Sequence, residues 1–140
     1  MDLTFFSTVN WLAILVATAA YFMLGALWYG MLFKTAWIKG SGIDMNSPAA
    51  KKGGAGLMLM TFLLEFITAL GIAILASRIG ATGGIISGIK LGLFTGTAFA
   101  AIAVWISFMY QMKSKQMMAI DGGYHILGHI ICGAIIYAFA

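Results

Sequence analysis

The chain has 140 residues, of which 62% are hydrophobic; eight are Lys or Arg and four are Asp or Glu. Soluble domains average about 25% charged residues, and a sphere of this size cannot hide so much apolar surface from water. The composition therefore excludes soluble globular, disordered and disulfide-rich proteins and predicts an integral membrane protein. The net charge of +4 is better explained as a signal for membrane topology than as a surface for nucleic-acid binding. We expect the lipid bilayer as a partner and no nucleic acid.

Four apolar stretches are each long enough to cross a bilayer, which takes about 20 apolar residues in a helix. They cover approximately residues 7–33, 55–77, 83–112 and 119–140. None shows the strict alternation of barrel strands. The predicted fold is therefore an all-α membrane protein, a compact bundle of four transmembrane helices that forms one membrane domain over residues 1–140.

Lysines in the short connections predict the orientation, because cytoplasmic loops carry an excess of Lys and Arg. Six of them lie in residues 34–54 or between the last two stretches: Lys34, Lys39, Lys51, Lys52, Lys113 and Lys115. The opposite side has only Arg78, with Lys90 just inside the third stretch. We therefore place loop 34–54 in the cytoplasm and both termini outside.

The third stretch carries a row of glycines at every fourth position: Gly84, Gly88, Gly92 and Gly96. Such a row leaves one helix face nearly bare, so that another helix can approach it closely. The partner helix could belong to the same chain or to a second copy, and the spacing favours neither. A pore or substrate path lined by this row is a weaker third interpretation.

Glu65 is the most informative single residue. It lies 13 residues from both Lys52 and Arg78, or about 20 Å of helix from each, near the bilayer midplane. A charged carboxylate there costs several kcal/mol unless it is protonated, paired or hydrated. Thr61 and Thr68 lie one turn to either side and extend a polar stripe. Glu65 is either a functional group or a structural hydrogen-bonding residue that locks the bundle.

The fourth stretch opens with Asp121, His125 and His129, which share one helix face at i, i+4 and i+8. His129 lies at about the depth of Glu65, so a contact between them is plausible, and Tyr21 could add a hydroxyl. These residues predict a graded path for protons from the cytoplasmic interface to the midplane. His125 and His129 could instead share a metal ion, but hydrogen-bonded packing histidines are more common.

Two sequence motifs carry a resemblance to a known family. The first stretch has Asn10, then Gly25-Ala26-Leu27-Trp28-Tyr29 and Trp37, and the last opens with Ile120-Asp121-Gly122-Gly123-Tyr124. Over nearly the whole chain, this combination resembles the small bacterial and fungal membrane proteins grouped as domain of unknown function 1761. The resemblance implies a multi-pass membrane protein of this size and no catalytic residue. It singles out these positions: Asn10, Trp28, Tyr29, Trp37, Asp121 and Tyr124.

No catalytic triad order, phosphate loop or paired-cysteine site is present in the sequence, so we expect neither an enzyme nor a cofactor. The leading hypothesis is a homo-oligomeric transporter or channel in the bacterial cytoplasmic (inner) membrane, packed through the glycine row. It would move an unidentified ion or small solute, with Glu65 as the titrating centre. The alternatives are a non-transporting scaffold or accessory subunit and, more weakly, a metal-binding membrane protein.

Overall fold

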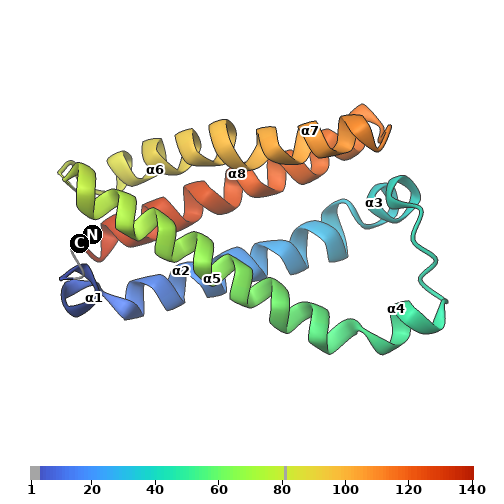
Figure 1. The fold of residues 1–140 in the computed structure, drawn as a ribbon, viewed down its shortest axis with the longest axis horizontal. Helices are drawn as coiled ribbons and strands as arrows, with labels where there is room; N and C mark the ends of the chain where they lie inside the picture. The colour runs from blue at the N-terminus through green and yellow to red at the C-terminus, as the bar shows by residue number, and fades with distance from the viewer. Residues whose placement is uncertain (1–3, 81) are drawn as a thin grey trace.

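The computed structural model describes residues 4–80 and 82–140, whose regular secondary structure is entirely helical and includes no strand (Figure 1). Four helices are long and apolar enough to cross a membrane, so the chain is a multi-pass membrane protein. Its first span joins α2 (Trp11–Leu27) to a π-helical turn, η1 (Trp28–Leu32), and its second is α5 (Gly54–Ile79). The third joins α6 (Gly84–Thr95), a π-helical turn η2 (Gly96–Ala101) and α7 (Ile102–Tyr110). The fourth is α8 (Lys115–Ala138), and three short helices complete the chain: α1 (Phe5–Thr8), α3 (Lys34–Ser41) and α4 (Pro48–Lys52).

Capping side chains decide where the first and last spans begin. Asn10 Oδ1 accepts a hydrogen bond from the amide of Ala13 at 3.1 Å, and Ser114 Oγ accepts one from the amide of Met117 at 3.2 Å. Each bond satisfies an amide that the first helical turn leaves without a partner. The first span therefore begins at residue 11 rather than 7, and the last at residue 115 rather than 119.

The expected loop 34–54 contains two helices, α3 and α4. The C-terminus of α3 is closed by Gly42, whose φ of 73° is the left-handed conformation that glycine adopts easily. Lys113, from the turn before α8, donates to the carbonyls of Ser41 at 2.9 Å and Gly40 at 3.5 Å. A cation at this position also opposes the negative end of the helix dipole. The two lysine-rich connections are thus joined to each other.

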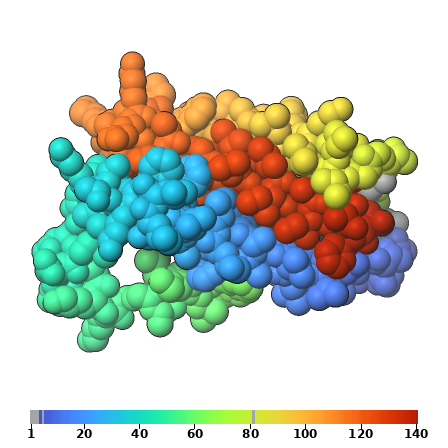
Figure 2. Space-filling model, turned by 180° about the vertical axis from the view of Figure 1, so that it is seen from behind, coloured from blue at the N-terminus to red at the C-terminus, as the bar shows by residue number. Residues whose placement is uncertain are grey.

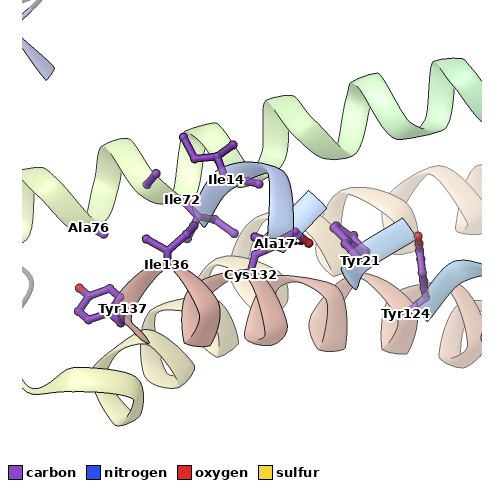
Figure 3. Close-up of a cluster of buried hydrophobic side chains, with 11 residues drawn as sticks. Ile14, Ala17, Tyr21, Ile72, Ala76, Tyr124, Cys132, Ile136 and Tyr137 are labelled. Atoms are coloured by element: carbon purple, nitrogen blue, oxygen red, sulfur yellow. Dashed lines mark hydrogen bonds between the residues drawn. The ribbon is translucent and has the colours of Figure 1, made fainter. Parts of the chain in front are cut away.

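Helix α8 is the centre of the bundle and the most buried of the four spans. It lies between α2 and the α6–α7 helix (Figure 2), and it also contacts α3 and α5. In the core between α2, α5 and α8, Tyr137 lies at the terminal end, small and branched side chains follow, and Tyr21 and Tyr124 lie towards the middle (Figure 3). The buried members of the core are Ile14, Ala17, Ala69, Ile72, Ala73, Ala76, Cys132 and Ile136, together with Tyr21, Tyr124 and Tyr137.

The glycine row packs against α8 of the same chain. A Cβ atom added to Gly88, Gly92 or Gly96 would approach backbone atoms of α8 more closely than side chains do in proteins. Gly84 lies outside this contact, and an added Cβ there meets nothing within 4 Å. Three of the four glycines therefore face a helix of the same chain. Because α8 covers this part of the row, a second copy of the chain would have to pack against another face.

The six lysines named above lie at one end of the bundle, on α3, on α4, in the turn between α7 and α8, and at the first residue of α8 (Figure 1). Helix α1 and the end of α8 lie at the opposite end, where Thr8 and Ala140 line the same cavity. Near the lysine end, the first part of α5 separates from the other spans, and residues 54–60 are exposed on every side.

Candidate functional site

A polar cluster lies where α2, α5 and α8 meet, about halfway along the spans. Its side chains come from three helices that are far apart in sequence, and most are buried or half-buried. Hydrogen bonds and ring contacts connect its members in pairs. We define the polar cluster as Tyr21 and Tyr29 from the first span, Glu65 from α5, and Asp121, Tyr124 and His125 from α8.

Glu65 is the most buried charged residue of the cluster, with 6% of its surface exposed. One carboxylate oxygen, Oε1, accepts a hydrogen bond from the hydroxyl of Tyr124. The other, Oε2, is buried and has no hydrogen-bond partner among the described residues. Buried polar atoms in proteins are nearly always paired, and an unpaired one in the membrane interior is especially costly. The Glu65 site is therefore incomplete when only this chain's side chains are counted.

The expected contact between Glu65 and His129 is not formed. His129 Nδ1 is hydrogen-bonded instead to the Oγ1 of Thr95 on α6, at 3.0 Å. Thr61 and Thr68 do share the α5 face of Glu65, but their hydroxyls donate to their own helix, to the carbonyl four residues earlier (2.9 and 3.1 Å). The structure therefore brings neither threonine nor His129 into hydrogen bonding with the carboxylate.

Two tyrosines of the first span bind the predicted polar face of α8. The Tyr21 hydroxyl and His125 Nδ1 are hydrogen-bonded at 2.7 Å, and the Tyr29 hydroxyl donates to Asp121 Oδ1 at 3.0 Å. The Tyr124 ring contacts both tyrosines, with centroid separations of 5.1 Å to Tyr21 and 5.0 Å to Tyr29. These contacts hold the Tyr124 ring in place while its hydroxyl points at α5.

Two glycines make room for the tyrosines. A Cβ atom on Gly25 would lie 2.9 Å from the hydroxyl oxygen of Tyr124, and one on Gly128 would overlap the ring of Tyr21. Larger residues at either position would push a tyrosine away from its hydrogen-bond partner. The glycine of the Gly-Ala-Leu-Trp-Tyr motif is thus explained by the neighbouring helix.

Most of the family-pattern residues lie together where the first span meets the last. Trp28 Nε1 donates to the carbonyl of Ile120 at 3.0 Å, beside the Tyr29–Asp121 hydrogen bond. Trp37 of α3 packs edge-on against Tyr29, with ring centroids 5.4 Å apart. Asn10 is the exception, because it caps α2 at the other end of the bundle. Both motifs therefore serve to join α8 to the first span at the lysine-rich side of the polar cluster.

The two histidines that could have shared a metal ion are each engaged through Nδ1 with a different neighbour, His125 with Tyr21 and His129 with Thr95. Within residues 4–80 and 82–140, no three His, Cys, Asp or Glu side chains gather closely enough to hold a metal ion. The cluster consists instead of hydroxyl, imidazole and carboxyl groups, which form hydrogen bonds and can bind or release protons.

Two hydrogen-bond partners were not predicted from the sequence: Tyr124 for Glu65 and Thr95 for His129. No sequence feature singles out Thr95, which lies within an apolar stretch. Tyr124 belongs to the Ile-Asp-Gly-Gly-Tyr motif and lies one residue before His125, so the motif did point to it. Depth in the membrane alone does not distinguish Tyr124 from His129 as the partner of Glu65.

Comparison with known proteins gives one match. A family model described as "Protein of unknown function (DUF1761)" matches residues 12–137. No curated protein and no solved structure matches the chain. The matched segment contains all members of the polar cluster and nearly the full length of the four spans. The chain therefore belongs to the DUF1761 family of membrane proteins, as its two motifs indicated.

Proposed function

We propose that this protein carries protons, alone or with a small solute or ion, across the bacterial inner membrane, and that Glu65 is its proton-binding group. The observation that supports this is the unpartnered Oε2 of a carboxyl group that is 94% buried at mid-membrane. An ionised carboxylate needs more donors than Tyr124 supplies, and a protonated one needs an acceptor for its own hydrogen. A site that exchanges its partner during each cycle has this incompleteness, whereas a purely structural carboxyl is expected to be fully paired.

The remaining cluster residues supply a route from the lysine end. Asp121 is half-buried and bound to Tyr29, and Tyr124 follows three residues, or about 5 Å, further along α8. The Tyr124 hydroxyl in turn donates to Glu65 of α5. With the lysine end in the cytoplasm and both termini outside, protons would reach Glu65 from the cytoplasmic side. The single bundle is tightly packed, so a solute larger than a proton would need a second copy of the chain, assembled through a face other than the glycine row.

The test is proton flux into proteoliposomes that enclose a pH-sensitive dye, driven by a potassium diffusion potential. Glu65→Gln keeps an oxygen that accepts from Tyr124 but cannot ionise, so flux should fall to the rate of protein-free vesicles. Thr68→Val is the matched control: it lies one turn away on α5, and its hydroxyl binds its own helix, so flux should be unchanged. Wild-type flux in Glu65→Gln would remove Glu65 from the mechanism.

The second candidate is a non-transporting scaffold or accessory subunit. It is favoured by the pairing of the other cluster groups across helices, Tyr21 with His125 and Tyr29 with Asp121, which would lock the bundle. In that case, no protein-dependent flux would be seen in wild type, and Glu65→Gln would change only the free energy of unfolding.

A further inference from the structure

We propose that the cavity at the terminal end of the bundle is the second entrance to Glu65, closed by an apolar barrier of Ile14, Ala73 and Ile136. This inference rests on the proposed transport function, because it supplies the access route from the side opposite the lysines. The barrier, rather than Glu65 itself, would then decide when the buried site communicates with the outer solution.

The cavity has a volume of about 410 Å³ and lies between the ends of α2, α5 and α8. These are the same three helices that hold the polar cluster. Its lining includes the polar residues Thr8, Asn10 and Ser77. On each helix, the lining residue nearest the middle of the span is apolar: Ile14 on α2, Ala73 on α5 and Ile136 on α8. These three residues form the inner wall of the cavity.

Beyond this wall the core continues directly to the polar cluster. Figure 3 shows Ile136, Cys132, Tyr21 and Tyr124 following one another along the bundle. Ile14 precedes Tyr21 by seven residues and Ala73 follows Glu65 by eight, so the occluded layer is about 10–12 Å thick. Apolar constrictions of this kind exclude water until the helices move apart.

The two sides of the layer differ in a way that fits a closed gate. Towards the lysine end, hydrogen-bonding side chains extend from Glu65 to the half-buried Asp121. Towards the terminal end lies the open cavity. The buried residues between are mostly small or branched. Two of their side chains donate hydrogen bonds, and both bond to backbone carbonyls of α2: Thr18 Oγ1 to Ile14 at 2.8 Å and Cys132 Sγ to Ala17 at 3.7 Å. A small separation of α2 from α8 would therefore connect both sides.

Cys132 provides the test because it is the single cysteine of the chain, is fully buried, and lies between the barrier and Glu65. The probe is a charged, membrane-impermeant thiosulfonate applied to sealed vesicles of either orientation. Ile14→Ala and, independently, Ile136→Ala should raise the rate of Cys132 modification several-fold, and only from the terminal side. Leu15→Ala, whose side chain is 49% exposed on the outside of α2, is the matched control and should leave the rate unchanged.

Unchanged modification in both barrier variants, or an equal increase from both sides of the membrane, would overturn the proposed entrance. A melting temperature measured in detergent shows whether a variant is folded, and Ile14→Val replaces Ile14→Ala if the latter is not. Modification of Cys132 reports access without any flux. Faster Cys132 modification from the terminal side in the barrier variants, together with wild-type proton flux in Glu65→Gln, would therefore refute the role of Glu65 and still support the entrance.

Discussion

Tyr124→Phe is the substitution that most directly measures the bond at the centre of the bundle. Among the described residues, it removes the one donor to Glu65 and leaves both carboxylate oxygens without a partner. An unsatisfied buried acceptor costs about 1–3 kcal/mol, whereas side-chain hydrogen bonds within membrane bundles average about 0.6 and reach about 1.7 kcal/mol. Because Glu65 is only 6% exposed, we expect a value near the upper end, about 1.5 kcal/mol of lost unfolding free energy.

A double-mutant cycle isolates this contribution from other effects of the hydroxyl. In the Glu65→Leu background, Tyr124→Phe should lower the unfolding free energy by less than about 0.5 kcal/mol, since no carboxylate remains to be satisfied. The assay is unfolding in mixed detergent micelles followed by circular dichroism. Tyr110→Phe, at a side chain that is 88% exposed, serves as the control and should have no effect. Equal losses in the wild-type and Glu65→Leu backgrounds would refute the reasoning, because the hydroxyl would then act independently of Glu65.

Three further substitutions test how the helices are held against one another. Gly92→Ala should destabilise the bundle by about 1–3 kcal/mol because the new Cβ overlaps α8, while Gly71→Ala, where nothing lies within 4 Å, should be neutral or stabilising; equal melting temperatures would contradict this. Gly128→Ala should lower stability by about 1–3 kcal/mol by displacing the ring of Tyr21, and the same change should cost less in a Tyr21→Ala background, where the ring is absent; an equal loss in both backgrounds would point elsewhere. Lys113→Met should speed amide hydrogen exchange in α3 about two- to fivefold while the spans stay protected, and unchanged exchange there would show that the cation does not hold α3.

The four spans were predictable because an apolar stretch of sufficient length has few alternatives in a bilayer. Their ends were not, since they depend on whether a polar side chain such as Asn10 or Ser114 turns back to cap the first turn. The sequence predicts a loop where α3 lies, because Lys34–Ser41 is polar and contains Gly40. Its stability comes from packing against α8 and from Lys113, neither of which is visible in the local sequence.

For the site, residue spacing predicted how deep each side chain lies in the membrane but not which way it points around the helix axis. Tyr124 and His129 are five residues apart on α8, which turns their side chains about 140° from each other. Glu65 therefore meets one of them, while the other faces Thr95 on α6. Choosing between them from sequence would have required knowing that α5 and α6 lie on different sides of α8. That arrangement follows from the close approach of the glycine row, whose partner helix the spacing left open.

The central position of α8 has a consequence for how the protein is made. Spans enter the membrane in the order of synthesis, and the one that all three others pack against is the last of the four. Before α8 is inserted, the glycine row and the tyrosines of the first span lack the helix that they pack against, and Glu65 lacks its hydrogen bond from Tyr124. The nascent chain therefore passes through a stage with three loosely associated helices and an unsatisfied carboxyl group.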